Sequence, residues 1–318
     1  MMVSPTVSIL VPVYNGANYL GMLINCLSDQ TMTDFEVIFV DDHSTDESQQ
    51  IIEQQSNLDN RFKILKMPQK GGNAVKGIKY GLPYCKGKFF FYMSQDDLID
   101  SDALERLVKT AEMKDADAVI PDMEWFFDGG KENQRTLPPN NLNYDSVIDG
   151  VTAFKLAMPW KIHGFYLRKT ALLKQIGYDD SYLTGDECNA RKYLFFCHRV
   201  AFCQTTFYYR QDNPLALTKV FRPHFIEDIY GYVALLEFMR NNSLDRKFIK
   251  EWHKFTVNLV FYYRSMAEQN SDLLRENEKK VTQEMLYEAR NRLLYFSINS
   301  LLFEGFLNIL RKCKINWK

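Results

Sequence analysis

"VSILVPVY", at residues 7–14, is a short and almost entirely apolar stretch. Such a run is typical of a strand that is buried on both faces, as in a parallel sheet. A helical pattern follows it, with apolar side chains spaced three and four residues apart at Leu20, Leu23, Ile24 and Leu27. Together, the two stretches predict the first strand–helix unit of an α/β domain.

The same alternation continues through the first 120 residues. Strand-like runs recur as FEVIFV, RFKILKM, KFFFYM and DAVIPD, with helical patterns between them, and Ser44 with Glu47 suggests a capping box at the start of the second helix. Repeated units of this kind predict an α/β fold with a mostly parallel sheet flanked by helices. Strand signals fade near residue 222, so we expect a catalytic domain over 1–221 and a helical C-terminal region over 222–318.

The composition limits the classes of protein. Apolar residues make up 46% of the 318 residues, with 23 Phe and 18 Tyr, which excludes a disordered chain. A formal net charge of -1 gives no overall field to attract nucleic acid, so we expect no nucleic-acid partner. The six cysteines lack metal-binding spacing and are expected to be reduced thiols. The N-terminus shows no secretion signal pattern, so we expect a cytoplasmic protein.

Acidic residues gather where the predicted strands end. Asp41 and Asp42 close one strand, and Asp96 and Asp97 close another. Helix capping does not account for these four carboxylates, and ligands of open α/β sheets bind at this edge. Carboxylates beside phosphate oxygens suit a hard cation, so we expect Mg²⁺ or Mn²⁺ as a cofactor.

The turn after the first strand, PVYNG, argues against two common nucleotide-binding classes. A dinucleotide site would need GxGxxG there, but Pro12 and Tyr14 occupy the turn, and the chain contains no P-loop motif. The ring of Tyr14 is better suited to stacking on a base than to close approach of a pyrophosphate.

The stretches VSILVPVYNGANYL, DFEVIFVDDHSTDES and GKFFFYMSQDD resemble the family 2 glycosyltransferases of the GT-A fold, of the bacterial cell-surface polysaccharide type. The resemblance covers residues 1–210 and implies a nucleotide-sugar donor, a divalent metal and inversion at the anomeric carbon. It implies that Pro12 and Tyr14 line the nucleoside pocket, that Asn15 shapes the turn and that Asp42 accepts a hydrogen bond from the base.

The same resemblance assigns Asp96 and Asp97 to the acidic metal motif, one holding the cation and the other the ribose or sugar. The family often has a further Asp where this chain has Ser94. Which of the two carboxylates is the main metal ligand is left open at this point.

The stretch HGFYLRKTALLKQIGYDDSYLTGDECNARKYL resembles the family's segment between a sugar-contacting glycine and the catalytic acid. The resemblance implies that His163 and Gly164 face the donor sugar and that Asp186 or Glu187 is the general base of an inverting transfer. Helix N-terminal charge is the alternative explanation for both acids. Arg210, further on, either reaches the diphosphate or pairs with a surface acid.

The predicted reaction is therefore metal-assisted, inverting transfer of a sugar from a nucleotide-diphosphate-sugar to a hydroxyl of a glycan or lipid-linked acceptor. A sugar-1-phosphate nucleotidyltransferase would want a Gly-rich, cationic loop after the first strand, which PVYNG lacks. A non-catalytic sugar-binding protein would not need the acidic step at residues 185–187.

The end of the chain suggests where the enzyme works. Residues 293–318 are apolar and then basic, with a tryptophan near the end, which suits peripheral contact with the inner face of the cell membrane. Polar interruptions make this stretch a poor membrane span. Packing of the helix on the catalytic domain is the alternative.

Overall fold

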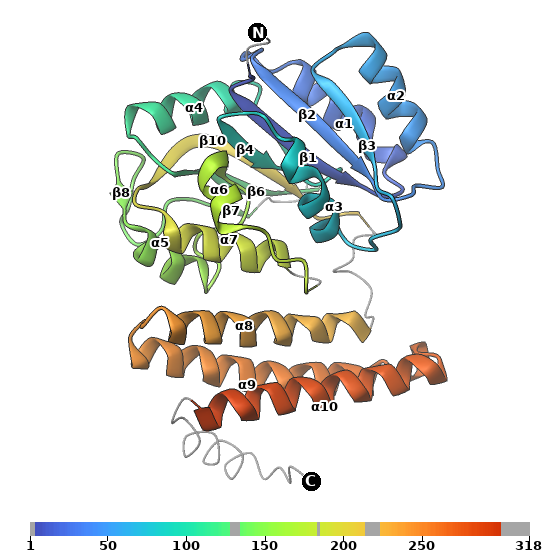
Figure 1. Ribbon diagram of the computed structural model, residues 1–318, viewed down its shortest axis with the longest axis vertical. Coiled ribbons are helices and arrows are strands. Elements are labelled where there is room, and N and C mark those ends of the chain that lie inside the picture. The colour runs from blue at the N-terminus through green and yellow to red at the C-terminus, as the bar shows by residue number, and fades with distance from the viewer. Residues whose placement is uncertain (1–3, 128–133, 183–184, 214–222, 300–318) are drawn as a thin grey trace. The chain divides into compact units, whose positions relative to one another are not determined.

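A computed structural model describes residues 4–127, 134–182, 185–213 and 223–299 (Figure 1). Contacts within the chain divide it into two compact units. We call Met1–Asp180 with Asn189–Asn213 the sheet unit, and Ser181–Cys188 with Pro214–Lys318 the helical unit.

The first half of the sheet unit follows the predicted alternation of strand and helix. Its elements are β1 (Val7–Val13), α1 (Ala17–Ser28), β2 (Phe35–Asp41), α2 (Ser48–Leu58), β3 (Phe62–Lys66), α3 (Ala74–Gly81), the 3-10 turn Leu82–Tyr84 and β4 (Phe89–Tyr92). Strands β1 to β4 are mutually parallel, in the order β3-β2-β1-β4. Their carboxyl ends therefore lie at one edge of the sheet, as the sequence predicted.

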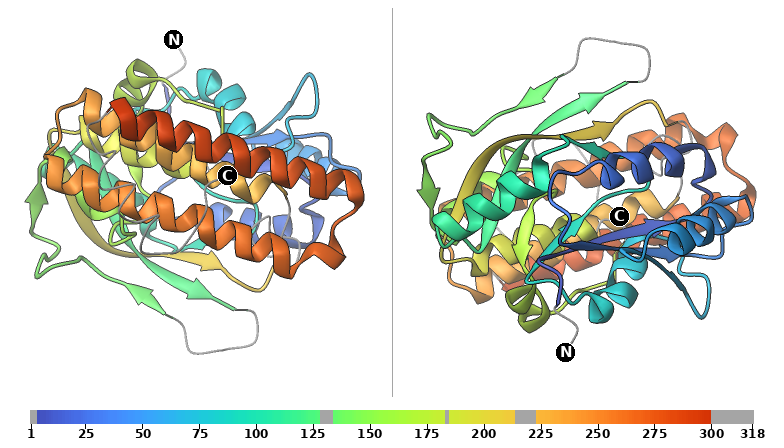
Figure 2. Two further views of the ribbon diagram at one scale, coloured as in Figure 1. Left: turned by 90° about the horizontal axis from the view of Figure 1, so that it is seen from below. Right: turned by 90° about the horizontal axis from the view of Figure 1, so that it is seen from above.

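The second half extends the sheet with mixed pairing. It contains β5 (Leu98–Ile99), α4 (Ala103–Met113), β6 (Ala118–Phe126), β7 (Arg135–Thr136), β8 (Val147–Ile148), α5 (Gly150–Ala157), β9 (Leu167–Lys169), α6 (Thr170–Ile176), α7 (Gly185–Phe196) and β10 (Val200–Arg210). Strand β9 runs antiparallel between β4 and β6, whereas β6 and β10 are parallel. Helices lie on both faces of the sheet (Figures 1 and 2), so the predicted α/β fold with a mostly parallel sheet is confirmed.

Strands β1 and β2 form part of the core of this unit. All seven residues of β2 are buried, which explains why its sequence shows no polar alternation. Helix α3 packs directly on these strands, because a Cβ on Gly81 would lie 2.5 Å from Leu10 Cδ1 and 2.7 Å from Val40 Cγ2. Nearer the start of the helix, a Cβ on Gly77 would lie 3.1 Å from Pro12 Cβ, so the first half of α3 lies beside the end of β1.

The predicted capping box is wrong. Helix α2 begins at Ser48, four residues after Ser44, and the carboxylate of Asp46 accepts hydrogen bonds from the Ser48 backbone N–H and hydroxyl. The Ser44 hydroxyl instead accepts a hydrogen bond from the backbone N–H of Asn15, 3.0 Å away. A contact with the turn after β1 therefore replaces the local cap.

The helical unit contains the 3-10 turn Pro223–Ile226, α8 (Glu227–Asn241), α9 (Arg246–Gln269), the 3-10 turn Ser271–Leu273 and α10 (Glu276–Asn299). Polar contacts join the three long helices across an apolar interior. Tyr263 of α9 donates a hydrogen bond to Asp228 of α8 (2.5 Å), and Tyr230 of α8 donates one to the Met285 carbonyl of α10 (3.0 Å). His253 Nε2 of α9 lies 2.6 Å from Ser297 Oγ of α10.

Part of the stretch predicted to contact a membrane is visible in α10. Leu293 and Phe296 are fully buried, and the Phe296 ring lies 6.0 Å from the ring of His253. This part belongs to the interior of the helical unit, while residues 300–318 lie outside the described part of the chain. Within the described residues, no helix has the length and apolar character needed to cross a membrane.

Candidate active site

The turn after β1 is held by a side-chain amide from the acidic motif. The backbone N–H of Tyr14 donates to Gln95 Oε1 (3.0 Å), and Gln95 Nε2 donates to the Tyr14 carbonyl (3.2 Å). A Cβ on Gly16 would lie 2.4 Å from the same Oε1, so glycine is needed for Gln95 to enter. The clamp joins the turn predicted to hold the nucleoside to the motif predicted to hold the metal.

Asn15 and its neighbours fasten this turn to the one after β2. Asn15 has a φ of 50°, in the left-handed region that asparagine tolerates, and its Oδ1 accepts from the backbone N–H of Thr45 (2.8 Å). The backbone N–H of Gly16 donates to the Ser48 hydroxyl (2.8 Å). Asn15 therefore joins the turn after β1 to the turn after β2, and its part in binding the donor stays a prediction.

Asp42 organises a third loop. Its two carboxylate oxygens accept from the backbone N–H groups of Gly71 (2.5 Å) and Gly72 (2.7 Å), and only 6% of the residue is exposed. Lys70, just before these glycines, donates to the Tyr14 hydroxyl (2.8 Å), and its ammonium lies 4.2 Å from the centre of that ring. Asp42 thus shapes the predicted nucleoside pocket; its bond to the base stays a prediction.

The two carboxylates after β4 have different surroundings. Asp97 is 1% exposed, and its oxygens accept from the backbone N–H groups of Arg210 and Ser94, both 3.2 Å away. Asp96 is only partly buried, and its Oδ2 accepts from the Asn213 side-chain amide (2.6 Å). Burial, reinforced by the Asp96 charge, raises the pKa of Asp97 well above its usual range, and burial also raises the pKa of Asp96.

Arg210, at the end of β10, is a buried cation that braces this motif. Its Nε donates to the Asp96 carbonyl (3.1 Å), and its Nη1 forms an ion pair with Asp212 (3.1 Å). The guanidinium lies 4.7 Å from the centre of the Phe126 ring, and the residue is only 7% exposed. Pairing with an acid, one of the two alternatives left by the sequence, is present, since Asp212 is 29% exposed and pairs with Arg210. Contact of Arg210 with the diphosphate stays a prediction.

The donor set can be compared with what a divalent cation needs. Across the residues that the structure describes, no three His, Cys, Asp or Glu side chains converge to hold a metal by themselves. Mg²⁺ is often bound by one or two carboxylates together with substrate phosphates, so a site of this kind needs fewer protein ligands than an all-protein site. The partly exposed carboxylate of Asp96 fits it, whereas the oxygens of Asp97 are enclosed by backbone donors.

His163 is buried within the sheet unit. It is 2% exposed, its Nε2 lies 2.8 Å from the Pro121 carbonyl, and its Nδ1 accepts from the backbone N–H of Phe165 (3.2 Å). Burial lowers the pKa of His163 to about 4, so the ring is neutral. The Gly164 carbonyl accepts from Arg168 Nη2 (2.7 Å). These contacts favour a structural His163, and its role beside a sugar stays a prediction.

Asp186 and Glu187 lie in the first turn of α7, and both side chains are partly buried. Acidic residues in this position are favoured by the helix dipole. By their contacts they belong to the helical unit, whereas Asp96 and Asp97 belong to the sheet unit. A role as general base therefore stays a prediction for either residue.

Comparisons with known proteins identify the family of the chain. The model of the family "Glycosyl transferase family 2" matches residues 8–177. Glycosyltransferase GlyG of Streptococcus pneumoniae is 24% identical over 234 residues, which are 71% of this chain and 77% of GlyG.

Two solved structures share the fold. That of Staphylococcus aureus TarS 1–349 with UDP-GlcNAc has a TM-score of 0.65 at 17% identity and covers 95% of this chain and 92% of that chain. The structure of the mannosyltransferase PcManGT from Pyrobaculum calidifontis with GDP-Man and Mn²⁺ has a TM-score of 0.50 at 14% identity. The match covers 94% of this chain and 88% of that chain. The chain spans 31% of the length of the curated TarS sequence. Because the family model matches more than half of its residues, the chain belongs to glycosyl transferase family 2 and is a glycosyltransferase.

Proposed function

We propose that this glycosyltransferase moves a sugar from a nucleotide-diphosphate-sugar to a hydroxyl of a glycan or lipid-linked acceptor of the cell-surface polysaccharide type, with inversion. The observation that carries the proposal is the joining of the loops after β1, β2, β3 and β4 through Gln95 and Asp42, with the carboxylate of Asp96 beside them. Complexes of similarly folded proteins with UDP-GlcNAc, and with GDP-Man and Mn²⁺, support the donor class and the metal.

In this proposal the sheet unit holds the donor. Pro12 and the Tyr14 ring line the base pocket, and Asp42 accepts from the base with the lone pairs that its loop contacts leave. Asp96 would hold Mn²⁺ or Mg²⁺, which when bound supplies charge stabilisation of the departing diphosphate. Asp97, fixed by two backbone donors, keeps the turn in shape so that Asp96 faces the phosphates.

The acceptor side completes the reaction. Asp186 or Glu187 takes the proton from the acceptor hydroxyl while the oxygen of that hydroxyl bonds to the anomeric carbon. The bond from that carbon to the diphosphate oxygen breaks on the opposite face, so the configuration inverts, as in inverting glycosidases. The nucleoside diphosphate leaves with the bonding electron pair.

We place the enzyme in the cytoplasm, in peripheral contact with the inner face of the membrane through its basic end. Because Leu293 and Phe296 are buried in the helical unit, a truncation before them would disturb the fold. Vesicle binding is therefore better tested in the full chain, with Arg311, Lys312, Lys314 and Lys318 changed to Gln. Unchanged binding to anionic vesicles would refute a role for these four cations.

The reaction is tested with a panel of UDP-, GDP- and dTDP-sugars. We expect one donor to raise the melting temperature more with Mn²⁺ than with EDTA, and NMR of the transferred sugar to show the inverted anomer. A product with retained configuration would refute the proposed stereochemistry, and the absence of metal-enhanced stabilisation by any nucleotide-sugar would refute the proposed donor site.

A further inference from the structure

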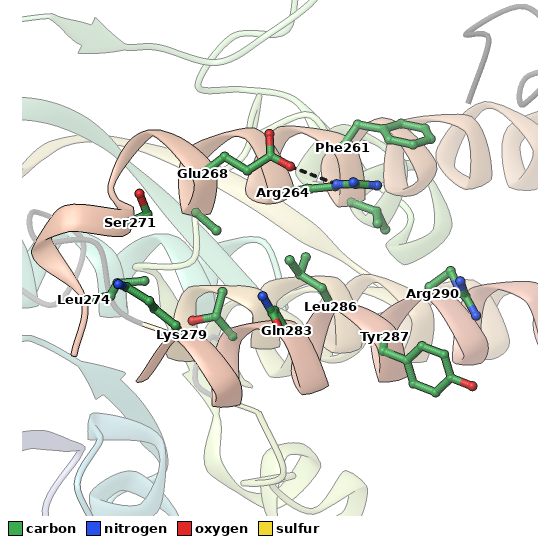
Figure 3. A pocket seen from close by; sticks show the side chains of 13 residues that line it. Phe261, Arg264, Glu268, Ser271, Leu274, Lys279, Gln283, Leu286, Tyr287 and Arg290 are labelled. Carbon is green, nitrogen blue, oxygen red and sulfur yellow. Dashed lines mark hydrogen bonds and ion pairs between the residues drawn. The ribbon is translucent and has the colours of Figure 1, made fainter. Parts of the chain in front are cut away.

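A groove runs between α9 and α10 within the helical unit. It encloses about 440 Å³, within the range of ligand-sized pockets, roughly 300–1,000 Å³. Residues 260–290 supply all the side chains that line it, and Figure 3 shows them projecting from both helices. Its apolar lining includes Val260, Ala267, Leu274 and Leu286.

The charged side chains of the groove are mostly positive. Arg264, Lys279 and Arg290 line it, against one acid, Glu268. Arg264 pairs with Glu268 (3.1 Å) and Lys279 with Glu276 (2.7 Å), and all four of these side chains are at least 36% exposed. Exposed pairs of this kind contribute little, so these cations can exchange their partners for a ligand's anion.

Apolar lining and cations together select the occupant. The chain's own end carries Arg311, Lys312, Lys314 and Lys318 and no acid after Glu304, so like charges oppose its docking in the groove. A second copy bound through a two-fold axis would bring the same cations face to face. A phospholipid with an anionic headgroup matches both features, because its acyl chain meets the apolar lining and its phosphate meets the cations.

The surface near the groove also suits a membrane interface. Tyr287, which lines the groove, is 60% exposed, and Leu273, in the turn between the two helices, is 79% exposed. Exposed aromatic and aliphatic side chains beside cations are typical of segments that lie at the boundary of headgroups and acyl chains.

We propose that the groove between α9 and α10 binds an anionic phospholipid of the membrane surface. The site is separate from the one that holds the donor and uses none of the basic residues at the end of the chain. The proposal deepens the proposed peripheral membrane contact. It rests on that contact for one point, namely that the ligand comes from a membrane.

The first test changes charge. Full-length protein is mixed with vesicles of phosphatidylcholine, with and without phosphatidylglycerol, and the bound fraction is measured by flotation. The triple variant Arg264→Gln, Lys279→Gln, Arg290→Gln should lose about 100-fold in partition coefficient, as expected for three cations near an anionic surface. The matched control changes the exposed Lys247, Lys250 and Lys254 of α9 to Gln, an equal charge change outside the groove. Equal losses in the two triple variants, or no loss in the groove variant, would overturn the proposal.

The second test fills the groove without changing charge. Ala267→Phe should weaken vesicle binding about tenfold while the melting temperature and the donor-induced stabilisation stay as in the wild type, which separates this site from the transferase reaction. Inorganic phosphate at constant ionic strength should not compete; if it abolishes binding, the groove is a phosphate site and not a lipid site. If the variant of the four C-terminal cations loses all binding while the groove variants keep it, the tail and not the groove holds the membrane.

Discussion

Arg210→Met would remove the buried cation that braces the acidic motif. The change deletes the hydrogen bond to the Asp96 carbonyl (3.1 Å), the ion pair with Asp212 (3.1 Å) and the contact with the Phe126 ring (4.7 Å). A hydrogen bond from a charged donor contributes about 1.5–3 kcal/mol and a cation–π contact about 0.5–2 kcal/mol. The Asp212 side chain is 29% exposed, so its pair adds little. We therefore expect a loss of about 3 kcal/mol, or roughly 5–10 °C in melting temperature.

The same variant should also weaken metal-dependent binding, because the Asp96 backbone loses its donor. The bond from the Arg210 backbone N–H to Asp97 is retained, so the motif should loosen rather than collapse. Arg210→Lys keeps the charge but lacks the planar guanidinium, so its melting temperature and metal-dependent affinity should lie between those of the wild type and of Arg210→Met. Thermal unfolding and calorimetry with a nucleoside diphosphate and Mn²⁺ provide the two measurements.

The control is Arg106→Met, which breaks a surface pair with Asp102 in which the Arg106 side chain is 52% exposed. It also removes the hydrogen bond from Arg106 Nη1 to the Gln204 carbonyl (3.0 Å). Because both contacts are exposed, the change should cost about 1 kcal/mol or less. An Arg210→Met protein with the stability of this control and the Mn²⁺-dependent affinity of the wild type would refute the bracing role.

Three further predictions concern individual residues of the site. Asp96→Asn should abolish the gain in nucleoside diphosphate affinity that Mn²⁺ gives, while Asp97→Asn should chiefly lower the melting temperature; calorimetry that shows the metal effect intact in Asp96→Asn would exclude it as a ligand. Asp186→Asn or Glu187→Gln, whichever removes the base, should lower turnover by about 10²-fold or more with donor affinity little changed. If steady-state rates of both variants match the wild type, both acids are helix charges only. Gly16→Ala should expel Gln95, since the new Cβ would lie 2.4 Å from its Oε1, and weaken donor affinity, whereas Gly21→Ala, with open space around it, should leave the affinity unchanged. Equal affinities in the two alanine variants would show that the clamp is dispensable.

The strands and their acidic ends could be read from the sequence because each depends on local pattern. Runs such as VSILVPV and FEVIFV are buried on both faces, and their almost entirely apolar character reflects this directly. The edge at which Asp42 and Asp96 lie then follows from parallel topology alone.

The contacts that brace the site could not be predicted, because they join residues far apart in the chain. Gln95 pairs with Tyr14, 81 positions away, and Arg210 with Asp96, 114 positions away. No periodicity encodes such a pairing. The capping box predicted at Ser44 is wrong for the same reason: the Ser44 hydroxyl accepts a hydrogen bond from the backbone N–H of Asn15, 29 positions away, and a local motif cannot show this.

The way in which Asp42 holds its loop has an evolutionary consequence. Within the described part of the chain, its carboxylate accepts hydrogen bonds only from the main-chain N–H groups of Gly71 and Gly72, so the anchoring does not depend on the side chains before them. Residues 68–70 are all exposed, and the Lys70 ammonium lies over the Tyr14 ring. In the proposed donor site, we expect substitutions at these three positions to alter which base or sugar is preferred while the anchor persists. We therefore expect donor choice to be adjustable in this loop without loss of the fold.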